Sequence, residues 1–105
     1  MANPHRGEAT LTLNGQVQTL RLSLGALVQL EQALGSDSLT DLVARFENGS
    51  FRTRDILAVL YAALRAGGWT GTAQDLADAD IQGGPIAAAQ TAARVLALSF
   101  GADQA

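Results

Sequence analysis

Few residues in this sequence have side chains suited to catalysis or to tight metal binding. The one histidine, His5, lies in the polar opening segment MANPHRG, and the chain has no cysteine. A lone imidazole forms neither a catalytic triad nor a metal site, and the neighbouring residues supply no partners for it. The absence of cysteine also excludes a disulfide, a thiolate-bound metal and a cysteine nucleophile. We therefore interpret His5 as a solvated residue.

An acidic group and two glycine pairs are the next candidates for a binding site. Asp75, Asp78 and Asp80 lie close together, but the segment TAQDLADADI lacks the glycine and the final glutamate of an EF-hand loop. The glycine pairs at 67–68 and 83–84 match neither the Walker nor the dinucleotide-binding pattern. We interpret the aspartates as solvated residues of a short helix and the glycines as helix ends. The sequence thus predicts no metal and no cofactor.

Glu31 is the carboxylate that the pattern places among apolar residues. On a helical wheel it falls inside the arc of Leu24, Leu27, Leu30 and Leu34. A carboxylate there must be paired or lose its charge, and such a group can act as a general acid or base. No second catalytic group is identifiable near it in the sequence. We therefore favour a structural role, in which Glu31 pairs with an arginine or caps a helix, and we predict no enzyme.

A β-hairpin with Asn14 and Gly15 at its turn is the element around which the chain is organised. Asn-Gly is the strongest short-range hairpin signal, because both residues tolerate the positive φ of a type I′ turn. This turn pairs Leu13 with Gln16 and gathers the aliphatic side chains other than Val17 on one face: Ala9, Leu11, Leu13, Leu20 and Leu22. A two-stranded sheet is not stable alone in water, so helices must cover that face.

Five helices are predicted after the hairpin from apolar spacing and end signals. Their expected ranges are 24–34, 38–48, 53–66, 72–81 and 85–100. Ser23, Ser38 and Thr72 are the expected N-caps, since their hydroxyls can accept from the first turn of a helix. The result is an α+β fold in which the N-terminal antiparallel hairpin packs against about five helices.

Length and charge limit the organisation of the chain and its partners. The 105 residues predict one domain over 9–101, with a flexible N-terminus over 1–8 and a flexible C-terminus over 102–105. The net charge of −3 and the scattered arginines are a poor pattern for nucleic-acid binding. No apolar run is long enough for a membrane span, and the opening lacks the apolar core of a signal peptide. We therefore expect a cytoplasmic protein with no membrane or nucleic-acid partner.

The helix predicted over 85–100 is apolar around almost its whole circumference. Such a helix is either sandwiched inside the domain or docked on another chain. The candidate partner-binding residues are Ala88, Ala92, Val95 and Leu98. We expect this face to be exposed in the isolated chain, so that aspartate in place of Val95 or Leu98 weakens partner binding without unfolding the protein.

Four segments carry a family resemblance. They are MANPHRGE, LRLSLGALVQLEQALG, SLTDLVARFENGSFRTRDILAVLYAALRAGG and IQGGPIAAAQTAARVLALSFG. They resemble the gene-transfer-agent family of small phage-tail proteins, which is also described as a tail assembly chaperone family and in places as tail tube protein. The resemblance covers almost the whole chain, is most specific at ANPHRGE and LRLSLGAL…LEQALG, and brings no catalytic residues.

The resemblance implies a role in building a phage tail inside a bacterial host cell. Tail assembly chaperones in general bind the tape-measure protein, shield its apolar surface, help recruit tail tube subunits and are absent from the mature particle. One alternative is a structural tail component that stays in the particle, although such subunits usually need more strand than one hairpin supplies. A small uncharacterised enzyme is the second alternative. The resemblance leaves open whether copies of this chain form a homo-oligomer.

Overall fold

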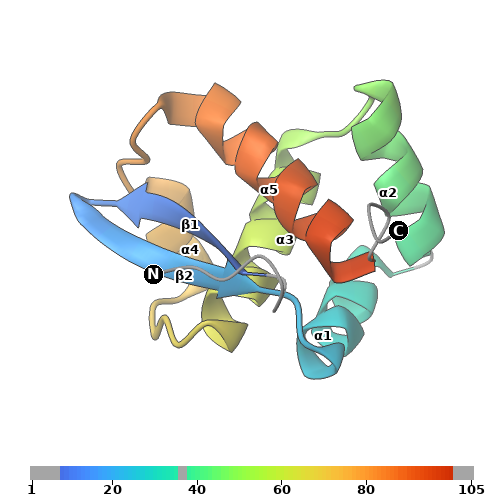
Figure 1. Cartoon of the computed structure of the whole chain (residues 1–105), viewed down its shortest axis with the longest axis horizontal. Helices are drawn as coiled ribbons and strands as arrows, with labels where there is room; N and C mark the ends of the chain where they lie inside the picture. The colour runs from blue at the N-terminus through green and yellow to red at the C-terminus, as the bar shows by residue number, and fades with distance from the viewer. Residues whose placement is uncertain (1–7, 36–37, 101–105) are drawn as a thin grey trace.

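The hairpin and the helices that follow it have the arrangement that the sequence predicts (Figure 1). The structure is a computed structural model, and it describes residues 8–35 and 38–100. An antiparallel pair of strands precedes five helices in the described residues, which is an α+β fold. Residues 1–7 of the flexible N-terminus predicted over 1–8, and the whole flexible C-terminus predicted over 102–105, lie outside the described residues. Glu8, which was predicted to belong to the flexible start, pairs with Arg21 in the sheet.

The hairpin consists of β1 (Glu8–Leu13) and β2 (Gln16–Arg21). Asn14 and Gly15 join them with φ angles of 51° and 81°, so both turn residues have the positive φ of a type I′ turn. The pairing follows the predicted register along the whole hairpin. All five aliphatic residues of the predicted inner face are buried: Ala9, Leu11, Leu13, Leu20 and Leu22.

The helices begin and end close to the predicted positions. They are α1 (Leu24–Leu34), α2 (Leu39–Asn48), α3 (Thr53–Ala66), α4 (Ala73–Asp78) and α5 (Gly84–Phe100). The Oγ of Ser23 accepts a hydrogen bond from the N–H of Ala26 at 3.1 Å, and Ser38 and Thr72 form capping boxes. Each cap satisfies backbone N–H groups that have no partner inside the helix, which is why these residues mark the helix starts.

The connection from α4 to α5 differs from the prediction. Ala79 takes an extended conformation with φ −71° and ψ 150°, so α4 ends at Asp78 rather than near Ile81. Ile81 instead forms an antiparallel bridge with Leu13, and the N–H of Gln82 donates to the carbonyl oxygen of Thr12 at 3.1 Å. This connection therefore covers the outer edge of β1 near the turn.

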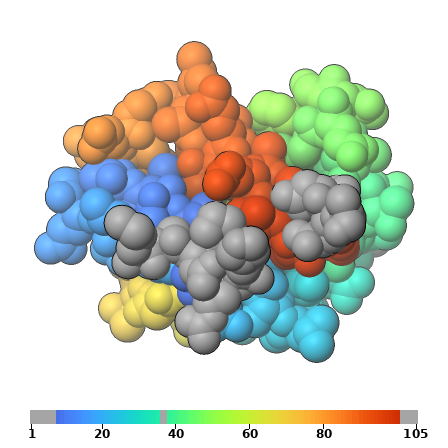
Figure 2. Space-filling view, viewed as in Figure 1, coloured from blue at the N-terminus to red at the C-terminus, as the bar shows by residue number. Residues whose placement is uncertain are grey.

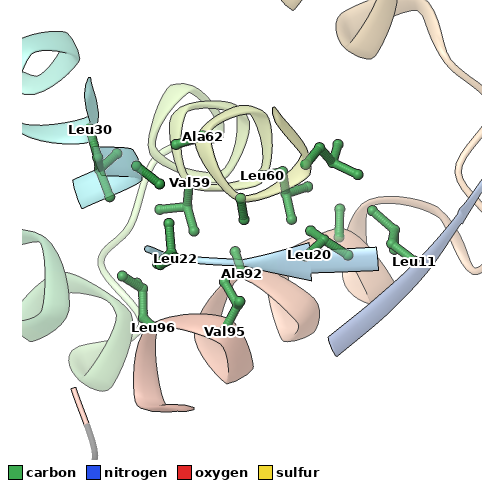
Figure 3. Close-up of a cluster of buried hydrophobic side chains, with 14 of the residues drawn as sticks. Leu11, Leu20, Leu22, Leu30, Val59, Leu60, Ala62, Ala92, Val95 and Leu96 are labelled. Atoms are coloured by element: carbon green, nitrogen blue, oxygen red, sulfur yellow. The ribbon is translucent and has the colours of Figure 1, made fainter. Parts of the chain in front are cut away.

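The core lies where the leucine-bearing face of the hairpin meets α3 and α5. The helix α3 contacts β2, α1, α4 and α5, while α5 contacts α3, both strands of the hairpin and α2. Figure 3 shows side chains from the hairpin, α1, α3 and α5 together in one cluster. Gly67, just after α3, allows the end of this helix to lie directly against β2, because a Cβ on Gly67 would overlap the carbonyl oxygen of Thr19. The sequence pattern predicts such a central place for α3, since its apolar arc is wide.

Candidate partner-binding surfaces

Glu31 is exposed, which corrects its predicted position among apolar side chains. The buried side of α1 is formed by Ala26 and Leu30, whereas Leu24 is 83% exposed. The predicted arc was wrong because it included Leu24, which rotated the expected buried face toward Glu31. An exposed carboxylate needs no buried partner, so nothing in this position favours acid–base chemistry.

Asp55 is the only buried charged side chain in residues 8–35 and 38–100, and it is 3% exposed. The Nε and Nη2 atoms of Arg45 donate to its Oδ2 and Oδ1, both at 3.0 Å. The backbone N–H of Arg52 donates to Oδ2 at 2.8 Å. Burial alone raises the pKa of Asp55, but the hydrogen bonds from Arg45 and Arg52 and the charges of both arginines lower it below its ordinary value. The carboxylate thus stays ionised and links α2 to α3.

The acidic group around α4 is solvated. Asp75, Asp78 and Asp80 are all exposed. The carboxylate of Asp75 accepts from the N–H of Thr72 at 2.9 Å, and that of Asp78 accepts from the Nε2 of Gln74 at 3.1 Å. In the part of the chain that the structure describes, no three histidine, cysteine, aspartate or glutamate side chains are grouped to hold a metal ion. His5 lies outside that part.

The hairpin turn docks on the connection that follows α4. The N–H of Asn14 donates to the carbonyl oxygen of Asp80 at 2.8 Å, and the N–H of Asp80 donates to the Oδ1 of Asn14 at 2.8 Å. Asn14 therefore has two roles, since it adopts the positive φ of the turn and also anchors a segment far along the chain. The sequence indicates the first role through the Asn-Gly pair but carries no local signal for the second.

The partner-binding face predicted on α5 is part of the core. Ala88, Ala92 and Val95 are buried, and Leu98 is half-buried. Figure 3 shows Ala92 and Val95 in the cluster that contains Leu20 of β2. The expected exposure of this face is wrong for Ala88, Ala92 and Val95, because the hairpin and α3 both pack against α5 and cover them. Ala92 and Val95 are 0% exposed, so they cannot contact a partner unless the domain opens.

The large apolar side chains that are exposed in the described residues lie on three elements. Among the described residues, the large exposed ones are Val17 on β2, Leu24 and Val28 on α1, and Ile86 and Phe100 on α5. Figure 2 shows α5 at the surface between the hairpin and α2, so its outer side is accessible. No helix in the described ranges has both the length and the apolar character to cross a bilayer. Exposed apolar side chains of this size are candidate contacts for other proteins.

A groove of about 410 Å³ lies between α3, α4 and α5. Its lining includes Ile56, Leu57 and Leu60 of α3, Leu76 and Ala77 of α4, and Ala88 of α5. Asp80 also lines it, beside the anchored turn. A smaller groove of about 180 Å³ lies between α2 and α5 and is lined by Phe46 and Phe100 among others. Sequence reasoning missed both grooves, because each depends on how separate helices pack together, which no local pattern in the sequence specifies.

Comparison with protein families agrees with the resemblance seen in the sequence. The model of one family, described as phage tail tube protein, GTA-gp10, matches residues 6–102. Comparison with curated proteins gives no significant match, and neither does comparison with solved structures. The family match covers nearly the entire chain, including every described helix and strand. The chain therefore belongs to the GTA-gp10 family of phage tail proteins.

Proposed function

We propose that this protein is a tail assembly chaperone, which binds the tape-measure protein and tail tube subunits in the bacterial cytoplasm while a tail is built. The family match over residues 6–102 supports a role in the phage tail, and the resemblance of the sequence to tail assembly chaperones supports the finer role. The structure is compatible with an adaptor, since a single core supports exposed apolar side chains and an apolar groove on its surface. Surfaces of this kind bind apolar segments of other proteins.

Co-expression with the tape-measure protein from the same genome tests the proposal. We expect a tag on this chain to retain the tape-measure protein on an affinity column and to increase its soluble yield, because the chaperone covers apolar surface. A tag on an unrelated small acidic protein is the control for non-specific retention. A tape-measure protein that stays insoluble, and that is not retained by this chain, would contradict the proposal.

The second candidate is a structural tail component, which the words "tail tube protein" in the family description favour. The two candidates differ in where the protein ends up. A chaperone leaves before the tail is complete, whereas a tube subunit stays in many copies. We expect mass spectrometry of purified particles to detect the major tube protein and to miss this chain. Detection of this chain at a tube-like copy number would favour the structural role instead.

A further inference from the structure

We propose that the groove between α3, α4 and α5 is the docking site for an amphipathic helix of the tape-measure protein, one whose apolar stripe is bordered by lysine or arginine. The inference rests on the proposed chaperone function and adds to it the site and the chemistry of the bound segment. It differs from the α5 face predicted from the sequence, most of which is buried in the core, since only Ala88 of that face lines the groove.

The floor of the groove has the character and size to take a helix. Ile56 and Leu57 are half-buried, so they contact the core on one side and remain accessible on the other. The lining part of α3 runs from Thr53 to Leu60 and spans about 10 Å, which is close to two helical turns. A bound helix can therefore place two or three apolar side chains on this floor, as in helix-in-groove recognition.

The connection that follows α4 forms one wall of the groove, and the hairpin holds this wall in place without a ligand. Two hydrogen bonds of 2.8 Å join Asn14 to Asp80, and the bridge between Leu13 and Ile81 follows directly. Asp80 and Ile81 both line the groove. Because this wall is already ordered, binding costs less conformational entropy, so a short apolar contact can be enough to hold a helix.

The charge around the groove selects the kind of helix. Residues 66–93 carry three carboxylates, Asp75, Asp78 and Asp80, and no lysine, arginine or histidine. Asp80 is exposed while it lines the groove, and Asp78 is exposed at the end of α4. Two arginines, Arg52 and Arg54, flank the lining residue Thr53 at the start of α3, so the positive charge lies at the α3 side rather than the α4 side. A helix with basic residues toward α4 therefore complements the groove.

Peptide binding to the full chain tests the site. The probes are fluorescein-labelled peptides that tile the tape-measure sequence, and fluorescence anisotropy measures binding. We expect Ala77→Arg, which puts a guanidinium into the groove from an exposed position on α4, to weaken the best peptide by at least about tenfold. Asp80→Arg should weaken it by about fivefold and reverse its salt dependence, because attraction becomes repulsion.

Two matched variants are the controls. Ala73→Arg makes the same change on α4 at an exposed residue outside the groove lining, and Glu31→Arg reverses an exposed charge on α1. Both should bind within about twofold of the unmodified protein. Circular dichroism melting shows whether each variant is folded.

The outcomes separate this inference from the proposed function. If the tape-measure protein co-purifies but the groove variants bind like their controls, the groove is wrong and the chaperone proposal stands. Tight binding of peptides that are acidic, or that lack an apolar stripe, would also overturn the groove. If neither the whole tape-measure protein nor any peptide binds, both proposals fall.

Discussion

Asp55 shows how one residue can hold two helices in place. Its carboxylate accepts a hydrogen bond from the backbone N–H of Arg52, at the start of α3. It also accepts a bidentate pair of hydrogen bonds from the guanidinium of Arg45 in α2. The guanidinium and the carboxylate match in geometry, and the pair is mostly removed from water, with 17% and 4% of the two side chains exposed. A pair of this kind is costly to break from one side, because the remaining charge loses its partner.

We expect the stability of the protein to fall in acid partly through Asp55. The pKa of Asp55 is lower in the folded protein than its ordinary value, so the ionised carboxylate favours the folded state. This contribution is complete above the unfolded pKa of about 3.9 and is lost as the pH falls through the lower folded pKa. Below about pH 4, urea unfolding should therefore show a steeper loss of free energy for the unmodified protein than for Asp55→Asn.

The Asp55→Asn variant should already be less stable at neutral pH, by about 2 kcal/mol, because it loses the charge that pairs with Arg45. Its amide oxygen can still accept the N–H of Arg52. Parallel pH curves for the two proteins would show that Asp55 does not account for the acid sensitivity.

Asn14 allows the turn and its docking to be tested separately. We expect Asn14→Gly to keep the type I′ turn, since glycine adopts positive φ, but to lose the Oδ1 atom that accepts from Asp80. The loss should be about 1 kcal/mol, measured as a lower midpoint of thermal or urea unfolding.

Gly15→Val is the matching change to the turn itself. It should cost more than Asn14→Gly, because a β-branched residue resists the φ of 81° at this position. An unchanged midpoint for Asn14→Gly would mean that the hydrogen bond to Asp80 adds nothing to stability. Equal effects of the two variants would contradict the separation of turn from docking.

At the scale of elements, α5 is the helix whose environment matters most. It lies along the hairpin, crosses α3 and contacts α2, so its apolar residues are used within the chain on more than one side. Its solvent-facing residues include Ile86, Gln90, Arg94 and Ala97. This almost wholly apolar helix therefore packs against the core on its inner side and meets solvent on its outer side.

Val95→Asp should unfold the protein. Val95 is fully buried, at 0% exposure, so an aspartate there places a charge in the core and removes apolar contacts. We expect a loss of more than about 4 kcal/mol, with no cooperative melting transition by circular dichroism. Arg94→Asp, at the exposed neighbouring position, is the control and should melt within a few degrees of the unmodified protein. A folded Val95→Asp variant would show that this face is not part of the core.

At the scale of the whole molecule, several candidate contact surfaces surround a single hydrophobic core. The hairpin and α2 lie at opposite ends of the view in Figure 2, with α5 between them. Large exposed apolar residues occur on β2, α1 and α5, while the groove involves α3 and α4 as well.

Much of this fold could be predicted from signals that involve only a few neighbouring residues. Asn14 and Gly15 set the turn and the register, and the caps at Ser23, Ser38 and Thr72 set helix starts. These signals act over a few residues, through allowed φ angles and backbone hydrogen bonds, so they can be read without knowing the rest of the chain. The family resemblance is likewise carried by contiguous segments, and the family match confirms it.

Only the tertiary structure decided which side of each helix is buried and where a binding surface lies. Periodicity cannot choose a face on a helix as apolar as α5, and on α1 the wrong arc placed Glu31 inside. The docking of Asn14 on Asp80, the pairing of Arg45 with Asp55 and the groove beside α4 all join residues from different elements. Whether a side chain is buried or paired depends on which residues of other elements pack against it. That depends on the whole sequence and not on any single position.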